Sequence, residues 1–251
     1  MIETWVYPAL TAVAVLTGFV DAIAGGGGLI MMPALLFAGV PPINALATNK
    51  LQSMFGTSVA CFNYARKGLV DWRANMLTII LVFAGASAGV IAVQAINTKA
   101  LALVIPLLLM AVALYVLVSP RMSDEDAHQR ISARGYSPVG AAIGAYDGFF
   151  GPGTGSFFTA TLVGLRGFGL TRATALTKLF NLTSNIASVL FFAVGGKMFW
   201  LLGLCMAAGA MAGGWIGSHS AMKFGARLIR PLLVALSLGL TARLLWGYFA
   251  A

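Results

Sequence analysis

The sequence predicts an all-α integral membrane protein made of two inverted structural repeats, each with a glycine-broken re-entrant helix pair and three spanning helices. Three observations lead to this prediction. Of the 251 residues, 59% are hydrophobic and only 9% are charged, whereas about 25% of the residues of an ordinary soluble domain are charged. Apolar runs without a charged side chain recur at residues 74–98, 100–119, 149–165 and 179–196. Finally, landmark residues of the first half recur in order in the second half.

The apolar runs indicate membrane-spanning helices. A run of about 18 or more apolar residues is long enough to cross the hydrocarbon core as a helix. The runs lack the strict alternation of a transmembrane strand, which favours helices over a barrel. In chain order, we expect elements at residues 5–24, 29–39, 44–65, 74–96, 100–118, 138–150, 156–165 and 179–196. The polar stretch 121–136 is the expected cytoplasmic linker between a first membrane repeat (1–120) and a second (137–251).

An internal duplication explains why the two halves look alike. Asp21, Gly25 and Gly27 match Asp147, Gly151 and Gly153 at an offset of 126 residues. After a loop that is two residues longer, Lys50, Gly68 and Trp72 match Lys178, Gly196 and Trp200 at an offset of 128. Each identity alone is weak, but their order at a nearly constant offset is hard to obtain by chance.

The basic residues indicate how the repeats run. If each half crosses the membrane four times, the loop cations divide almost evenly between the two sides. If each glycine break instead lets the chain turn back, each half has five elements, and only Lys99 and Lys197 oppose eleven cations on the other side. Cytoplasmic loops carry an excess of Lys and Arg. We therefore expect inverted repeats with both termini outside the cytoplasm, and the net charge of +9 requires no nucleic-acid partner.

Each half carries a glycine-rich break after an aspartate. The expected solute-binding backbone comprises Gly25, Gly26, Gly27 and Gly28 after Asp21, and Gly151, Gly153, Thr154 and Gly155 after Asp147. Glycine disfavours a helix by about 1 kcal/mol per residue relative to alanine. Short helices are expected to start near Leu29 and Ser156, and a helix N-terminus suits an anion. Discontinuous helices at matching positions of two halves point to a transport site, and the alternative is a simple packing kink.

A polar stripe recurs in both halves and supplies the other expected site residues. They are Asn49, Lys50, Gln52 and Ser53 in the first half, and Thr177, Lys178, Asn181 and Asn185 in the second. A lysine at the centre of a membrane helix costs about 2.5–3.5 kcal/mol on insertion scales. The two lysines therefore either bind an anion or neutralise Asp21 and Asp147, and both can hold if an anion competes for a paired lysine. The two aspartates are candidates for proton coupling or gating, because carboxylates in a low dielectric titrate readily.

The sequence lacks the residue patterns that a metal site or a nucleotide-binding loop requires. The two histidines and two cysteines are dispersed, without the spacing of metal ligands. No Gly-Lys-Ser/Thr sequence follows the glycines, as a nucleotide-binding loop requires. We expect no cofactor and no enzymatic activity.

The quoted motifs resemble the TauE/SafE sulfite exporter family, in particular its YfcA-like branch. The resemblance is carried by residues 18–30, Pro33, residues 47–53 and 62–68, and by residues 147–155 and 175–181 of the second half. It implies a multi-pass transporter of the bacterial inner membrane, with both termini then periplasmic. Family members are associated with export of sulfite, organosulfonates or related sulfur compounds.

These observations predict a secondary transporter that exports small anions, such as sulfite or organosulfonates, by alternating access with possible proton coupling. Its partners are a small anionic solute and the lipid bilayer, and the oligomeric state is left open. The alternative is an anion channel without gradient coupling. Flux into proteoliposomes with and without a proton gradient distinguishes the two.

Overall fold

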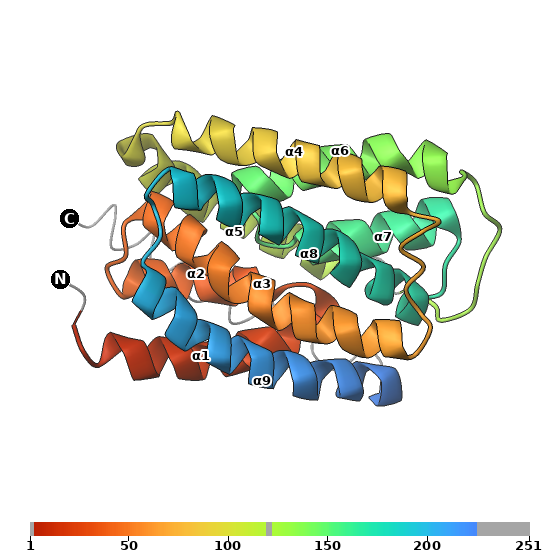
Figure 1. Cartoon of the computed structure of the whole chain (residues 1–251), viewed down its shortest axis with the longest axis horizontal. Helices are drawn as coiled ribbons and strands as arrows, with labels where there is room; N and C mark the ends of the chain where they lie inside the picture. The colour runs from red at the N-terminus through yellow and green to blue at the C-terminus, as the bar shows by residue number, and fades with distance from the viewer. Residues whose placement is uncertain (1–2, 119–121, 225–251) are drawn as a thin grey trace.

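The computed structural model describes residues 3–118 and 122–224, and every regular element in these ranges is an α-helix (Figure 1). In chain order the helices are α1 (Val6–Ala24), α2 (Gly27–Phe37), α3 (Pro42–Arg66), α4 (Met76–Gln94), α5 (Thr98–Val118), α6 (Ala133–Phe149), α7 (Thr154–Arg166), α8 (Leu170–Val194) and α9 (Trp200–Phe224). The expected basic residues Arg121, Arg227 and Arg230 lie outside the described residues.

Five of these helices are long and apolar enough to cross a membrane: α1, α4, α5, α8 and α9. The prediction of an all-helical membrane protein is therefore confirmed. α2 and α7 have 11 and 13 residues, and at 1.5 Å per residue they reach only about 16–20 Å. Neither is long enough to cross a hydrocarbon core of about 30 Å.

Several helix boundaries differ from the expected ones, and the largest shift is at α8, which begins at Leu170 and not at residue 179. Gly27 and Gly28 belong to the first turn of α2, so the first glycine turn consists of residues 25–26 alone. α7 likewise begins two residues earlier than expected, at Thr154. α6 begins at Ala133, inside the stretch assigned to the linker, because the Ser132 side chain caps the helix by accepting a hydrogen bond from the Gly135 amide. Pro138 is thus within the helix and does not start it.

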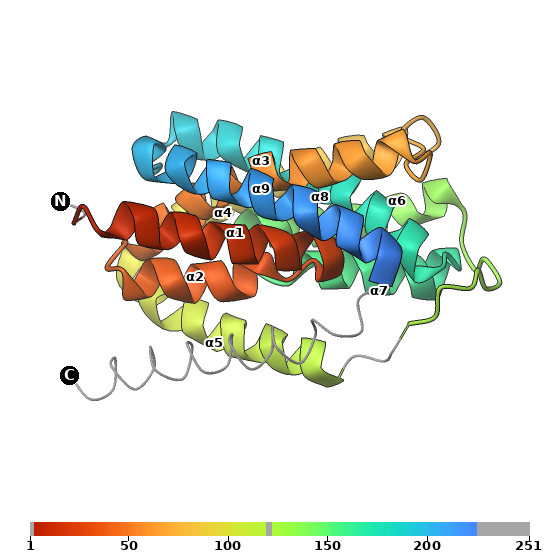
Figure 2. The same ribbon diagram turned by 90° about the horizontal axis from the view of Figure 1, so that it is seen from below.

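Inside the molecule, the first glycine turn touches the start of α7, directly after the second glycine turn. Figure 2 shows α1 and α2 side by side, with the first glycine turn (residues 25–26) away from both ends of the bundle. The second glycine turn (residues 150–153) joins α6 to α7, and Gly151 and Gly153 have φ angles of 99° and 83°. A Cβ atom on Gly25, whose φ is 70°, would overlap the backbone of Gly155. Only glycine satisfies both this close approach and the left-handed backbone.

Small residues bring the first helix of each half against the fourth helix of the other. α1 packs along α9, and α6 packs along α4. A Cβ atom on Gly85 of α4 would overlap the carbonyl oxygen of Ala141, and one on Gly213 of α9 would overlap that of Val15. Apolar helices gain little from associating in lipid unless their backbones approach closely. These glycines therefore set the distance between the paired helices.

We predict that Gly85→Ala destabilises the protein by about 1–3 kcal/mol, the usual cost of overpacking, although alanine is the better helix former. Gly164→Ala in α7 is the matched control, since no atom lies within 4 Å of its added Cβ position. Thermal unfolding of both variants in detergent measures the effect. Equal melting temperatures for the two variants would contradict the close packing of α4 on α6.

Candidate functional site

The centre of the bundle is formed by α3 and α8, the two helices that carry the polar stripes. They pack against each other, and their lysines are buried: Lys50 is 2% exposed and Lys178 is 0% exposed. A buried ammonium group is tolerated only with a counter-charge and hydrogen bonds around it. Both lysines find these partners on helices of the opposite half.

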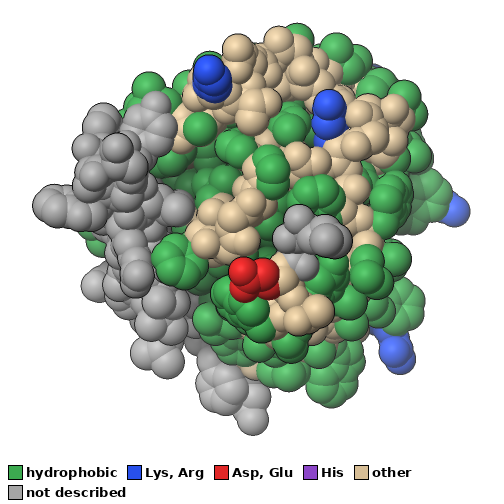
Figure 3. Space-filling model, turned by 90° about the vertical axis from the view of Figure 1, so that its left-hand side faces the viewer, with side chains coloured by type: hydrophobic (Ala, Val, Ile, Leu, Met, Phe, Trp, Pro, Cys, Tyr) green, Lys and Arg blue, Asp and Glu red, His purple; other side chains and the backbone are tan. Residues whose placement is uncertain are grey.

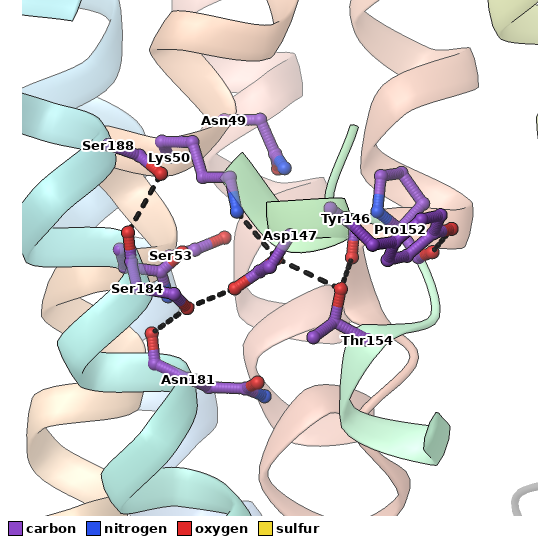
Figure 4. A network of polar contacts seen from close by, with 12 residues as sticks. Asn49, Lys50, Ser53, Tyr146, Asp147, Pro152, Thr154, Asn181, Ser184 and Ser188 are labelled. Atoms are coloured by element: carbon purple, nitrogen blue, oxygen red, sulfur yellow. Dashed lines mark hydrogen bonds and ion pairs between the residues drawn. The ribbon is translucent and has the colours of Figure 1, made fainter. Parts of the chain in front are cut away.

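Lys50 of α3 pairs with Asp147 of α6, with 2.6 Å between Nζ and Oδ1 (Figure 4). The same carboxylate accepts a hydrogen bond of 3.0 Å from the Thr154 hydroxyl at the start of α7, and one from the Ser184 hydroxyl of α8. Asp147 is only 3% exposed. This one carboxylate thus joins four helices through three hydrogen-bond donors.

Lys178 of α8 makes the equivalent contact with α1. Its Nζ lies 3.0 Å from Oδ2 of Asp21 and also donates to the Asp21 backbone carbonyl. That carbonyl accepts the Gly25 amide as well, at 2.8 Å, where α1 ends. The Asp21 side chain is 25% exposed, so this pair is more open than the pair of Lys50 with Asp147.

A polar cavity lies between α3, α8 and the two glycine turns. Its lining residues are Asp21, Gly25, Gly28, Asn49, Lys50, Ser53, Thr57, Asp147, Gly151, Gly153, Thr154, Gly155, Asn181 and Asn185. The empty space between them, with its opening to solvent, is about 360 Å³. Apart from the glycines, all the lining side chains are polar or charged, so the cavity suits a small polar solute.

Most of the residues expected to form the site line this cavity, but five do not appear in its described lining: Gly26, Gly27, Gln52, Thr177 and Lys178. Gln52 donates to Asn49 Oδ1 and Ser53 Oγ at 3.0 and 3.1 Å, and therefore positions two lining side chains. The hydroxyl of Thr177 lies 3.0 Å from that of Thr159.

Two residues at this site, Thr57 and Ser184, were not predicted from the sequence. Thr57 lies four residues after Ser53, so the helical period of the stripe could have identified it. Ser184 donates to Asp147, but a serine in an apolar helix gives no signal of its partner.

The start of α7 already faces a negative charge. Its Thr154 and Ser156 amides donate within the second glycine turn, to Gly151 and Gly153. The Thr154 hydroxyl meanwhile donates to Asp147. The carboxylate of Asp147 therefore takes the place beside this helix start where an external anion was expected.

A bundle of apolar helices around buried ion pairs and a small internal polar cavity defines a polytopic membrane protein. The family model "Sulfite exporter TauE/SafE" matches residues 10–244. The chain therefore belongs to the TauE/SafE family of membrane transporters.

Related proteins cover almost the whole chain. It is 40% identical over 247 residues to the "Probable membrane transporter protein YfcA" of Escherichia coli (strain K12), covering 98% of this chain and 92% of the relative. It is 43% identical over 237 residues to the "Probable membrane transporter protein ORF9" of Sinorhizobium sp, covering 94% and 91%. A "Probable membrane transporter protein" of Haemophilus influenzae is 42% identical over 243 residues, covering 96% and 95%. No solved structure matches the chain.

We predict that Asp147→Asn destabilises the protein by about 3–5 kcal/mol, because it leaves Lys50 buried without its counter-charge. Asp126→Asn is the matched control. Asp126 pairs with Arg172 at 3.7 Å, but both side chains are more than half exposed, so its loss should cost about 0–1 kcal/mol. Denaturation midpoints in detergent compare the two. Similar midpoints would show that Lys50 does not depend on Asp147.

Proposed function

We propose that the chain is a secondary transporter that exports small anions, with sulfite and organosulfonates as the leading candidates, by alternating access to the central cavity. The observation that carries the proposal is Lys50, a buried cation that lines a small polar cavity in a chain of a transporter family. A solute anion finds there a charged donor in a low dielectric, where hydrogen bonds to charged groups are strong.

The ion pair of Lys50 explains how such a site avoids trapping its solute. Removing a buried cation's partner is costly unless another anion replaces it. A solute that approaches Lys50 therefore competes with Asp147, and the carboxylate returns when the solute leaves. When the Asp147 carboxylate returns to Lys50, it displaces the solute, and the site is empty again for the next transport cycle.

Proton coupling follows from the same competition. Protonation of Asp147 would remove the charge that holds Lys50 and would leave the lysine to the solute anion. Asp21, the more exposed of the two carboxylates, would do the same for Lys178. We therefore assign both aspartates to coupling or gating, as intramembrane carboxylates commonly act.

Two features support inverted repeats that rock against each other. Each half contributes a glycine turn to the centre, and a lysine and an aspartate to crossed ion pairs. The first helix of each half also packs on the fourth helix of the other. Transporters with such repeats bind solute near the midplane between discontinuous helices.

The distribution of charge supports an orientation in the bacterial inner membrane. The loops at the right-hand end of Figure 1 include the connections after α3, α5 and α7. The basic residues in these loops and at the helix ends beside them are Arg66, Lys67, Arg73, Arg130, Arg134, Arg166 and Arg172. The opposite end shows few basic side chains (Figure 3). By the positive-inside rule the right-hand end and the linker face the cytoplasm, and the start of α1 faces the periplasm.

We predict that Lys50→Gln lowers sulfite flux in proteoliposomes at least about tenfold, since a hydrogen bond to a charged group contributes about 1.5–3 kcal/mol. Lys67→Gln, which alters an exposed lysine at the end of α3, should transport normally. Flux is measured with and without an imposed proton gradient. Unchanged flux through Lys50→Gln would remove the site, and gradient-independent flux without accumulation would identify a channel.

We predict that Lys99→Cys reacts with a membrane-impermeant maleimide in intact spheroplasts, whereas Lys67→Cys reacts only after permeabilisation. Lys99 lies in the first turn of α5, and Lys67 directly follows α3 at the opposite end of the bundle. The unaltered chain, with Cys61 buried and Cys205 partly buried, gives the background labelling. The reverse pattern would contradict the proposed orientation.

A further inference from the structure

We propose that the cavity selects a monoanion that carries a hydrogen-bond donor at its other end, in preference to a dianion or to an anion without a donor. This inference rests on the proposed function and names the class of solute. It follows from the charge balance of the cavity and from the way its donors and acceptors are divided between α3 and the facing helices.

The charge balance limits the charge that the solute can bring. Among the described lining residues, one cation, Lys50, faces two carboxylates, Asp21 and Asp147. Lys178 adds a second cation, but its amine is already bonded to two oxygens of Asp21. These four side chains sum to zero formal charge. Like charges close together in a low-dielectric cavity repel each other strongly, so a second negative charge on the solute is disfavoured.

The α3 side of the cavity is a surface of donors. Gln52 donates to the oxygens of both Asn49 and Ser53, which fixes the orientation of the Asn49 amide. The amide nitrogen of Asn49 and the hydroxyl proton of Ser53 are then left to donate, beside the ammonium of Lys50. The acidic end of a solute therefore belongs against α3.

The facing side offers acceptors. Asn181 of α8 is 6% exposed, and its Oδ1 has no hydrogen-bond partner among the residues that the structure describes. A buried acceptor left unpaired is destabilising. Asp21 adds a carboxylate that is one-quarter exposed. Figure 4 shows Asn181 projecting from α8 on the side of Thr154 and Asp147. A hydroxyl or a remaining acid proton on the solute would satisfy the Asn181 oxygen.

Singly protonated oxyanions and hydroxylated sulfonates combine both properties. Each has one negative charge for Lys50 and one donor for Asn181. A fully deprotonated oxyanion carries more than one negative charge and has no proton to donate to Asn181. The cavity therefore distinguishes solutes by protonation state and not only by size.

The test compares three two-carbon sulfonates of similar size in proteoliposomes, with sulfite as the reference anion. 2-Hydroxyethanesulfonate has one charge and a donor, ethanesulfonate has one charge and no donor, and sulfoacetate has two charges. We expect uptake of 2-hydroxyethanesulfonate to exceed that of ethanesulfonate about three- to tenfold, as one hydrogen bond allows. Sulfoacetate should be the poorest of the three.

Two variants assign the selectivity to its residues. Asn181→Leu should bring 2-hydroxyethanesulfonate down to the level of ethanesulfonate, and Asp21→Asn should raise sulfoacetate relative to ethanesulfonate. Glu125→Gln, in the exposed loop before α6, is the charge-matched control and should keep the wild-type order.

The outcomes separate this inference from the proposed function. Sulfite uptake together with equal transport of the three sulfonates, or with transport of none of them, overturns the inference alone. A preference for ethanesulfonate over its hydroxylated relative also overturns it, and would show that the Asn181 amide presents its nitrogen to the solute. Absence of uptake for all four anions overturns both proposals.

Discussion

The two crossed ion pairs at the centre of the bundle are the constraint on which the rest of the structure depends. Lys50 and Lys178 are buried where an unpaired ammonium would be very costly. Their partners, Asp21 and Asp147, each lie four residues before the first glycine of a turn. At the first turn the same Asp21 carbonyl accepts both the Gly25 amide and the Lys178 amine. The glycine turns and the ion pairs are therefore one structure: the break in the helix exposes the oxygen that the lysine needs.

Close helix packing is what allows these partners to meet. α1 and α6 carry the aspartates, and each lies against a helix of the opposite half through glycine contacts such as Gly85 with Ala141. In lipid, such backbone contacts replace the hydrophobic drive that would pack the helices in water. A larger side chain at these positions would move an aspartate away from its lysine. The small residues of the outer helices thus act on the electrostatics of the centre.

The sequence predicted the parts of this centre better than their connections. Repetition identified the glycine breaks, both lysines and both aspartates, because matching positions in two halves are a stronger signal than either alone. It did not predict which aspartate meets which lysine, since helical periodicity assigns a residue to a face but not to a neighbour. For the same reason Gln52 and Lys178 were expected to line the cavity, although they are absent from its described lining and instead bond to Asn49 and Asp21. The start of α6 was predicted at Pro138, but the helix begins five residues earlier, at Ala133, where Ser132 caps it.

The two ion pairs are related by sequence but differ in their surroundings, and this difference bears on how the molecule works. Asp147 is buried with three donors around it, whereas a quarter of the Asp21 side chain is exposed. Lys50 lines the cavity, whereas Lys178 is covered. Two related halves in one conformation must differ in this way if a single site is to open to one side of the membrane at a time. In alternating access by inverted repeats, the opposite conformation exchanges the environments of the two halves. If the proposed transport cycle operates in this chain, the exchange exposes Asp147 and covers Asp21, and each lysine in turn would face the proposed solute while the other holds the closed side together.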